Sequence, residues 1–253
     1  MKRLTALVCA LILLFSIPAA TDEKILNIAA LCYHSVTDNP LELSTYRISD
    51  KDLEADIQYF LERGYRFMLP REMWLANPAD KNLVLTFDDG YEDFYTVVFP
   101  LLKKYNIKAA VYMIASRIDK SGYLKSAQLR EMDASGLVEI GNHTNAVHFS
   151  GYSADMLQNN EQILLEYVED VKDGNRKLYQ ALGHGTESIA YPGGIYTPRL
   201  DNIMRINLGY TTTFTTDYGL VKTNYDILTP MKRVYRVLGD TAAKIEGMIN
   251  SLK

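Results

Sequence analysis

The sequence contains very little cysteine: Cys9 and Cys32 are the only two among 253 residues. Cys9 lies in an N-terminal segment that we expect to be removed, so the mature chain would keep one thiol and have no internal disulfide. Cys32 lies in the apolar stretch AALCYHSV, a setting that favours a buried strand residue over a nucleophile. The stability of the mature chain must therefore come from its packed core.

The sequence also lacks an apolar run long enough to cross a membrane. Lys2 and Arg3 precede an apolar stretch over residues 4–17, which is followed by Pro18 and two alanines. A bilayer-spanning helix needs about 20 apolar residues, so this stretch is short for one. A basic start, a short apolar centre and small residues are typical of a secretory signal peptide. We therefore expect residues 1–20 to be cleaved and the mature protein to be secreted or extracytoplasmic. The alternative is an uncleaved segment that holds the chain at the cell surface.

No dense basic cluster, internal repeat, low-complexity tract or Pro/Gly-rich linker occurs in the rest of the chain. The formal charge is −4 for the whole sequence and −6 without residues 1–20, because that segment carries two basic residues and no acidic ones. This balance argues against nucleic acid as a partner and against stable membrane insertion after cleavage, and it indicates no oligomeric state. The length and even composition predict a single domain over residues 21–253.

What the sequence does contain is an alternation of short apolar runs with amphipathic stretches. The predicted strands are Ala29–Ser35, Leu83–Phe87, Ala109–Ile114, Val138–Ile140, Ser188–Tyr191 and Thr211–Thr215. The predicted helices lie near residues 49–65, 91–105, 154–182 and 240–252. Ser49 is a suitable N-cap for the first helix, and Pro100 should kink or break the second. This alternation predicts an α/β fold made of parallel β/α units.

Two neighbouring carboxylates, Asp88 and Asp89, follow the apolar run LVLTF directly. The carboxyl ends of parallel strands are where such folds gather functional residues. Side chains of adjacent strand residues point to opposite faces, but Gly90 allows a sharp turn at this point, so both carboxylates can reach one cavity. An N-cap role would explain one aspartate. Two like charges at close range favour a site that holds a cation.

Two of the four histidines, His143 and His148, follow another predicted strand in VEIGNHTNAVHF. Each taken alone would most often be structural. Two imidazoles with one carboxylate make a three-ligand site with open positions, the usual pattern of catalytic zinc. The second carboxylate would then be free to act as a general base on the attacking water.

Together these residues resemble the polysaccharide deacetylases, also called NodB-homology domains or carbohydrate esterase family 4. The resemblance rests on TFDDGY and NHTNAVH, is supported by LCYHSVTDNP and AYPGG, and covers nearly the whole mature chain. It is greatest for the exported poly-N-acetylglucosamine deacetylases. It implies a distorted (β/α) barrel of one domain and the removal of acetyl groups from N-acetylglucosamine polymers, peptidoglycan, chitin or acetylated xylan.

Matched by position, the resemblance implies that Asp88 is the general base and that Asp89, His143 and His148 hold a divalent metal. The metal would be zinc, with cobalt or nickel as alternatives. Thr144 matches the residue that orients the loop after the first histidine.

The stretch AYPGG matches a motif of the family that contacts the substrate. Tyr191 and Pro192 fall on its substrate-binding positions, and the backbone N–H of Gly193 would face the oxyanion. Gly193 stands where the family usually has a tyrosine or similar residue, so any contact of that side chain is lost.

Two further departures concern histidines. The usual spacing is His-x-x-x-His, whereas His143 and His148 are separated by five positions, which turns about 140° on a helix. Both residues must then lie on a loop, as the longer spacing in the poly-N-acetylglucosamine branch also suggests, or His148 is not a ligand. The late Leu-x-His motif that normally supplies the catalytic acid is missing, because DILTPMKRVYRV contains no histidine.

Two residues are expected to fill the remaining catalytic roles. His34, in CYHSV, follows a predicted strand and matches the histidine used as the acid in a permuted branch of the family. A core histidine bonded to a carbonyl is the alternative for it. Arg233 would replace the arginine that usually orients the base, since ESIAYPGG has none.

The sequence thus predicts an exported, metal-dependent amide hydrolase whose partner is an acetylated polysaccharide. Two alternatives stay open. The first is an O-acetyl (xylan) esterase that uses the same metal site. The second is a catalytically silent glycan-binding protein of the same fold, for which the 18 tyrosines would be suitable.

Overall fold

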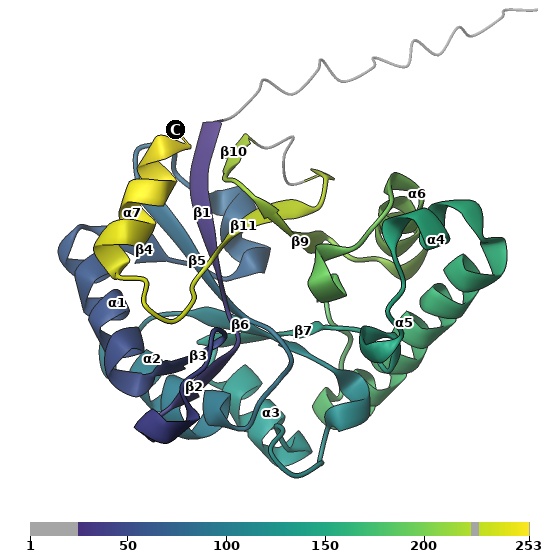
Figure 1. Cartoon of the computed structure of the whole chain (residues 1–253), viewed down its shortest axis with the longest axis horizontal. Helices are drawn as coiled ribbons and strands as arrows, with labels where there is room; N and C mark the ends of the chain where they lie inside the picture. The colour runs from purple at the N-terminus through teal and green to yellow at the C-terminus, as the bar shows by residue number, and fades with distance from the viewer. Residues whose placement is uncertain (1–24, 224–227, 253) are drawn as a thin grey trace, which may run out of the picture.

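The computed structural model describes residues 25–223 and 228–252, so the predicted signal peptide lies outside the described residues. Seven parallel strands close into a barrel (Figure 1). Around the ring they are β1 (Ile25–Tyr33), β11 (Met231–Tyr235), β9 (Thr212–Tyr218), β8 (Ser188–Ala190), β7 (Val138–Asn142), β6 (Ala109–Met113) and β5 (Lys81–Phe87). β5 pairs back to β1 from Ile28↔Asn82 to Tyr33↔Phe87 and closes the ring. The predicted single-domain (β/α) barrel is confirmed.

Four short strands lie outside the ring. β4 (Tyr65–Phe67) runs parallel to the first residues of β5, and β10 (Val221–Thr223) runs antiparallel to the start of β1. β2 (Ser35–Thr37) and β3 (Arg47–Ser49) form a separate two-stranded sheet just after β1.

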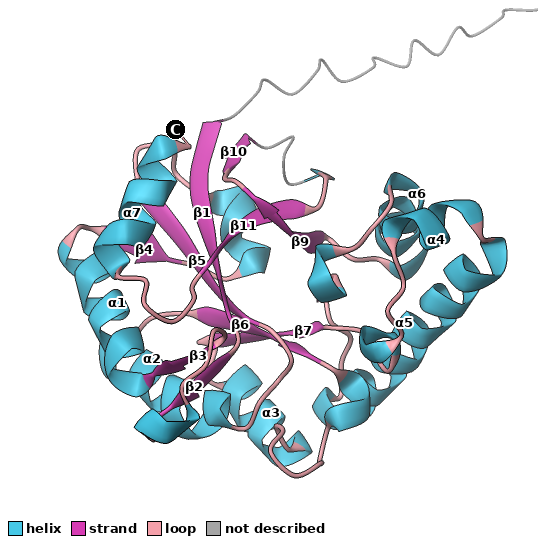
Figure 2. Cartoon of the chain, viewed as in Figure 1, coloured by secondary structure: helices cyan, strands magenta, loops and turns pink. Residues whose placement is uncertain are grey.

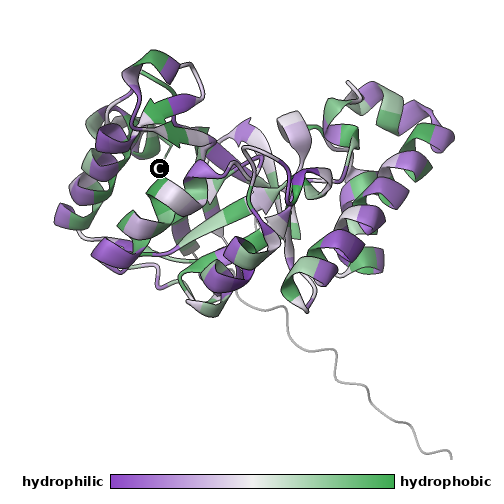
Figure 3. Cartoon of the chain, turned by 90° about the horizontal axis from the view of Figure 1, so that it is seen from below, coloured by the Kyte–Doolittle hydropathy of each residue, from purple (hydrophilic) through white to green (hydrophobic). Residues whose placement is uncertain are grey.

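Helices surround the barrel on its outer side (Figure 2). They are α1 (Asp50–Glu62), α2 (Phe99–Tyr105), α3 (Ser126–Ala134), α4 (Ala154–Asn159), α5 (Glu161–Leu182), α6 (Pro198–Asn202) and α7 (Ala242–Ser251). Figure 3 shows hydrophilic and hydrophobic residues side by side on these helices, as expected where one face packs on a sheet and the other meets water. No helix within the described ranges is long and apolar enough to cross a membrane.

The strands bury side chains on both faces. Leu31, Leu85 and Val111 belong to the large core between the strands and the helices α1, α2, α3 and α7. Ala30, Val84 and Ala110 alternate with them and belong to a second apolar cluster, as the period of two requires. Cys32 and Thr86 continue that second face toward the carboxyl ends of their strands. The side chains at the carboxyl ends of the strands therefore lie next to the apolar layer formed by Ala30, Val84 and Ala110.

Two predicted helices need correction. The stretch over residues 154–182 is two helices, because Asn160 has an extended backbone and its side chain accepts a hydrogen bond from Ile163 N to cap α5. The stretch over residues 91–105 begins only at Phe94, as a π-helical turn, and becomes α2 at Phe99. Pro100 lies in the first turn of α2. Val98 and Phe99 before it both have right-handed helical backbones, so the stretch is not broken there but changes from π to α geometry.

Candidate active site

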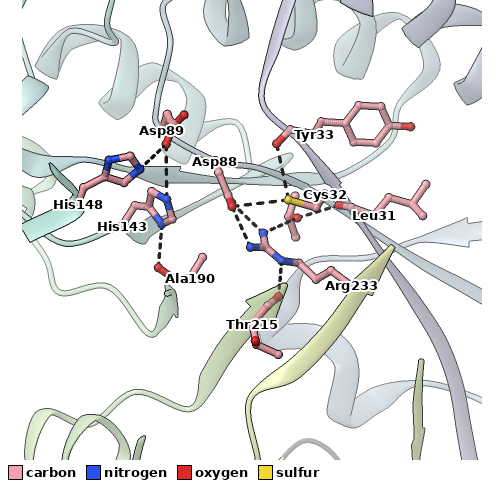
Figure 4. Close-up of polar contacts among 11 residues, drawn as sticks. Leu31, Cys32, Tyr33, Asp88, Asp89, His143, His148, Ala190, Thr215 and Arg233 are labelled. Carbon is pink, nitrogen blue, oxygen red and sulfur yellow. Dashed lines mark hydrogen bonds and ion pairs between the residues drawn. The ribbon is translucent and has the colours of Figure 1, made fainter. Parts of the chain in front are cut away.

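Asp88, Asp89 and Gly90 form the turn at the carboxyl end of β5. The backbone N–H of Asp88 still donates to the carbonyl of Tyr33 over 3.0 Å, which continues the pairing with β1. Asp89 and Gly90 both have left-handed backbones, with φ of 74° and 75°. These conformations end the strand alternation, so the two carboxylates are not sent to opposite faces of the sheet. In Figure 4, Asp89 points to two histidines and Asp88 points to Arg233.

The guanidinium of Arg233 binds the carboxylate of Asp88 through two parallel hydrogen bonds of 2.8 Å (Figure 4). Arg233 is fully buried and also donates to Thr86 Oγ1 (3.1 Å) and to the carbonyl of Thr215 (2.9 Å). Burial by itself would raise the pKa of Asp88, but the charge of Arg233, with His143 nearby, outweighs it and holds that pKa well below its usual range. Asp88 is therefore a fixed anion in a single orientation.

The thiol of Cys32 is a third neighbour of this carboxylate. Its Sγ lies 3.6 Å from Asp88 Oδ2, toward which it can donate weakly. Burial raises the pKa of the Cys32 thiol well above its usual value, so the group is neutral. Cys32 is a buried strand residue, as the sequence indicates.

Asp89 lies between the two histidines that follow β7. Its Oδ1 is 3.5 Å from His143 Nε2 and 3.1 Å from His148 Nε2 (Figure 4). One donor atom from each of the three residues lies within 4.8 Å of the others, close enough to share one ion. Burial would raise the pKa of Asp89, but the hydrogen bond from His148 and the proximity of His143 lower it on balance. The carboxylate is therefore ionised.

The donor set fits a divalent metal. His143 Nδ1 lies 2.7 Å from the carbonyl of Ala190, to which it can only donate. Burial lowers the pKa of His143, so the neutral ring is favoured and Nε2 carries a lone pair. That lone pair faces an ionised oxygen of Asp89, an arrangement that is repulsive unless a cation lies between them. Two imidazoles and one carboxylate are ligands that zinc prefers.

The five-residue spacing of the histidines is accommodated by a loop. His148 lies in a short 3-10 turn, and Thr144 before it has a left-handed backbone with φ of 66°. The carboxylate of Asp170, on α5, accepts hydrogen bonds from the backbone N–H groups of Asn145 (2.8 Å) and Ala146 (2.9 Å). This contact fixes the middle of the loop, so His148 returns toward Asp89 without a helix.

His34 lies near Asp88 but does not belong to the group formed by Asp89, His143 and His148. It follows β1, and one donor atom each of Cys32, His34 and Asp88 lie within 4.8 Å of one another. The ring of His34 contacts the rings of Tyr46 and Tyr235, with centroids 4.9 and 6.0 Å away. Its Nδ1 is buried without a hydrogen-bond partner in the described part of the chain. His34 is therefore near the proposed base, and its role as an acid stays a prediction.

The segment after β8 brings backbone, and not the side chain of Tyr191, to the site. Tyr191 is fully buried and its hydroxyl donates to Asp201 Oδ1 over 2.8 Å. The substrate-binding roles of Tyr191 and Pro192 stay predictions. Pro192 and Gly193 line a cavity of about 150 Å³ together with His148. Gly193 has a φ of 59°, and its role toward an oxyanion remains a prediction.

Sequence reasoning missed the residues that support the site. Thr86 lies two positions before Asp88 on β5, and that spacing alone could have placed it on the same face. Thr215 accepts a hydrogen bond from Arg233 through its backbone carbonyl, and Asp170 accepts one from the backbone of Asn145 through its side chain. Both are distant in sequence from their partners, so no local pattern points to them.

Comparison with known proteins identifies the family. Residues 76–213 match the family model for polysaccharide deacetylase, and this chain therefore belongs to that family. The matched segment includes Asp88, Asp89, His143 and His148. It excludes His34, which directly follows β1, and Arg233, which lies on β11.

Individual relatives agree with this assignment. The chain is 31% identical over 180 residues to the Bacillus subtilis protein YxkH, whose name includes the words polysaccharide deacetylase; the match covers 69% of this chain and 59% of YxkH. It is 24% identical over 172 residues to a poly-beta-1,6-N-acetyl-D-glucosamine N-deacetylase of Staphylococcus epidermidis, which covers 64% of this chain and 58% of that protein. The chain thus spans about three fifths of these curated relatives.

A solved structure covers more of the chain. The structure of IcaB from Ammonifex degensii superposes with a TM-score of 0.73 at 28% identity, over 88% of this chain and 97% of that one.

Proposed function

We propose that this chain is an exported, metal-dependent hydrolase that removes acetyl groups from an N-acetylated glycan. The observation that carries the proposal is the contrast between two adjacent carboxylates: Asp88 is bound to a buried arginine, and Asp89 faces two imidazoles. Membership of the polysaccharide deacetylase family supports the reaction class. The name of the staphylococcal relative supports an N-acetylglucosamine polymer as the substrate.

Asp89, His143 and His148 would hold a divalent metal, with zinc as the first choice and cobalt or nickel as alternatives. When bound, such an ion supplies a Lewis acid that polarises the acetyl carbonyl and acidifies water, and so lowers the basicity that Asp88 needs. His143 would ligate through Nε2, because its Nδ1 donates to the carbonyl of Ala190. That second bond holds the ring in one orientation.

Asp88 would take the proton of the attacking water. Arg233 occupies one lone pair on each of its oxygens, and the Cys32 thiol can occupy the second lone pair of Oδ2, so Oδ1 is the oxygen that keeps one for an incoming proton. The same arginine keeps Asp88 ionised at neutral pH. It also prevents the carboxylate from rotating, which maintains the alignment with the attacked carbon.

His34 and Gly193 would complete the reaction from two sides. The imidazole of His34 would donate a proton to the leaving amine, since an amide nitrogen is a very poor leaving group without one. The backbone N–H of Gly193 would donate to the developing oxyanion. Nearness of His34 to Asp88, and of Gly193 to His148, supports these assignments.

The experiment is to measure acetate release from N-acetylglucosamine oligomers, peptidoglycan, chitin and acetylated xylan, with and without a chelator. We expect release from at least one N-acetylated glycan, loss of release on chelation, and recovery with added zinc. Release from xylan alone would favour the O-acetyl esterase. Binding of a glycan without any acetate release would favour the silent binding protein.

Export is tested separately. The N-terminus of the protein recovered from the culture fluid of its host should lie near residue 21. Recovery of the whole protein in the cell pellet with Met1 intact would contradict it.

A further inference from the structure

Arg117 lies between two aromatic rings at the carboxyl end of β6. Its Cζ is 4.8 Å from the ring centroid of Phe149 and 5.5 Å from that of Tyr123. Both distances are in the range of cation–π contacts. Two ring contacts hold the guanidinium in a defined place, even though the side chain is only partly buried.

The aromatic rings connect Arg117 to both ends of the candidate metal site. Phe149 is next to His148 in the chain, and their ring centroids are 4.7 Å apart. On the other side, Tyr123 stacks on Tyr91 with centroids 5.4 Å apart. Tyr91 follows the other ligand, Asp89, by two positions in the chain. Arg117 is thus in the middle of an arc that runs from Asp89 to His148.

Arg117 has no charged partner. In the described part of the chain no carboxylate lies within ion-pair distance of it, and its Nε is buried without a hydrogen-bond partner. Every other described arginine has a carboxylate or a backbone carbonyl as a partner: Arg47, Arg63, Arg66, Arg71, Arg130, Arg176, Arg199, Arg205, Arg233 and Arg236. An unpaired cation beside the site is therefore unusual for this molecule.

The guanidinium plane explains what such a group can bind. Nε is buried, so the donors of Arg117 that a substrate group could meet are those of its two terminal nitrogens, which make no hydrogen bond within the described residues. Planar donors of this kind match the two oxygens of a carboxylate or the oxygens of a phosphate. A neutral sugar hydroxyl would leave the charge uncompensated.

We propose that Arg117 binds an anionic group of the substrate, so that the glycan deacetylated by this chain carries a carboxylate or phosphate next to its N-acetylated sugar. This inference rests on the proposed function and extends it to the substrate class. Arg117 is in this view a specificity-determining residue, which acts on substrate affinity through its charge.

The test compares three tetrasaccharides of N-acetylglucosamine: a neutral one, one in which a neighbouring sugar carries the lactyl carboxylate of a muramic acid, and one with a 6-phosphate. The wild-type protein should have a lower KM for an anionic tetrasaccharide, and the better of the two anions identifies the source. In Arg117→Gln, the ratio of the anionic KM to the neutral KM should rise roughly 10- to 100-fold, the range of charge-assisted hydrogen bonds. Arg117→Lys should restore part of the preference, and 0.5 M salt should weaken it in the wild type.

Arg63→Gln is the matched control. Arg63 also contacts an aromatic ring, Tyr59, at 3.4 Å from its Cζ, but it caps the far end of α1, away from the carboxyl ends of the strands. Its removal should leave the KM ratio unchanged.

Two results would overturn the inference. One is a wild-type protein without preference for either anion; the other is an Arg117→Gln variant that loses affinity for all three tetrasaccharides equally, which would make Arg117 a brace for Phe149. Calorimetric binding of the same compounds gives the answer independently of turnover. If no compound releases acetate, the proposed function fails, while the binding ratio still decides the role of Arg117.

Discussion

Asp88 and Asp89 are covalent neighbours with different partners, and exchanging each carboxylate for an amide should separate their roles. Asp88→Asn keeps the shape of the side chain and removes the proton acceptor. We expect this variant to retain its metal and to lose nearly all turnover, by a factor on the order of 10²–10⁴ for a lost general base. Metal content by elemental analysis and acetate release give the two readouts.

Asp89→Asn is the matched control for this pair. It should lose metal affinity first and activity as a consequence. If Asp88→Asn is the variant that loses the metal, the two roles are exchanged.

A second prediction at this scale concerns His34, which contacts Tyr46 and Tyr235 and lies near Asp88. An acid is needed when the leaving group is an amine and hardly needed when it is an activated phenol. His34→Ala should therefore lose about 10²–10⁴-fold in turnover of an N-acetyl glycan and much less with a nitrophenyl acetate. Equal losses on both substrates would show that His34 is structural.

At the scale of elements, the turn after β5 depends on a glycine. Gly90 has a φ of 75°, and a Cβ built on it would lie 2.1 Å from Met113 Sδ, on the neighbouring strand β6. Gly64 has the same φ but nothing within 4 Å of its Cβ position. Gly64→Ala should therefore cost about 1 kcal/mol for the left-handed backbone alone.

Gly90→Ala should cost about 1–3 kcal/mol more than Gly64→Ala, because Met113 must move to make room. Urea unfolding of both variants measures the difference. Equal losses would mean that Met113 adapts freely and that only the backbone conformation matters.

The elements that the sequence predicts well are those whose apolar runs are unbroken. β5 and β6 bury every described residue except Lys81, and their apolar runs LVLTF and AAVYM reveal them. β11 was missed because its inward position is Arg233, whose charge conceals the strand and whose partner Asp88 is distant in sequence. The candidate site is likewise only partly predictable from the sequence, because some of its contacts join distant segments. Ligands at strand ends follow from the pattern, whereas contacts between distant elements, such as the one between Asp170 and the histidine loop, do not.

At the scale of the whole molecule, stability should depend on pH through Asp93. This carboxyl accepts a hydrogen bond from Ser35 Oγ, and Arg47 and Glu42 are its charged neighbours. Burial raises the pKa of Asp93 to about 6. An acid whose folded pKa is raised favours folding while it is protonated. Its contribution is complete below the unfolded pKa of about 3.9 and is lost as the pH rises through 6.

Asp93→Asn should therefore become more stable relative to the wild type by about 2 kcal/mol between pH 4 and pH 8. Urea unfolding at pH 4, 6 and 8 measures the difference. Asp38→Asn, which removes an exposed carboxyl, is the control, and the difference in its free energy of unfolding from the wild type should be the same at all three pH values. A constant difference for Asp93→Asn as well would mean that Asp93 is ionised at little cost.

The contact of Asp170 with the loop between the two histidines has a consequence for which amino-acid substitutions this site can accept. Asp170 binds backbone N–H groups of Asn145 and Ala146, and it makes no demand on their side chains. Substitutions at these two positions are therefore compatible with an intact anchor, provided that the new residue has an N–H to donate. The loop that carries His148 can therefore be replaced by another sequence with the same backbone conformation. Such a replacement would change the side chains around His148 and leave the barrel unchanged.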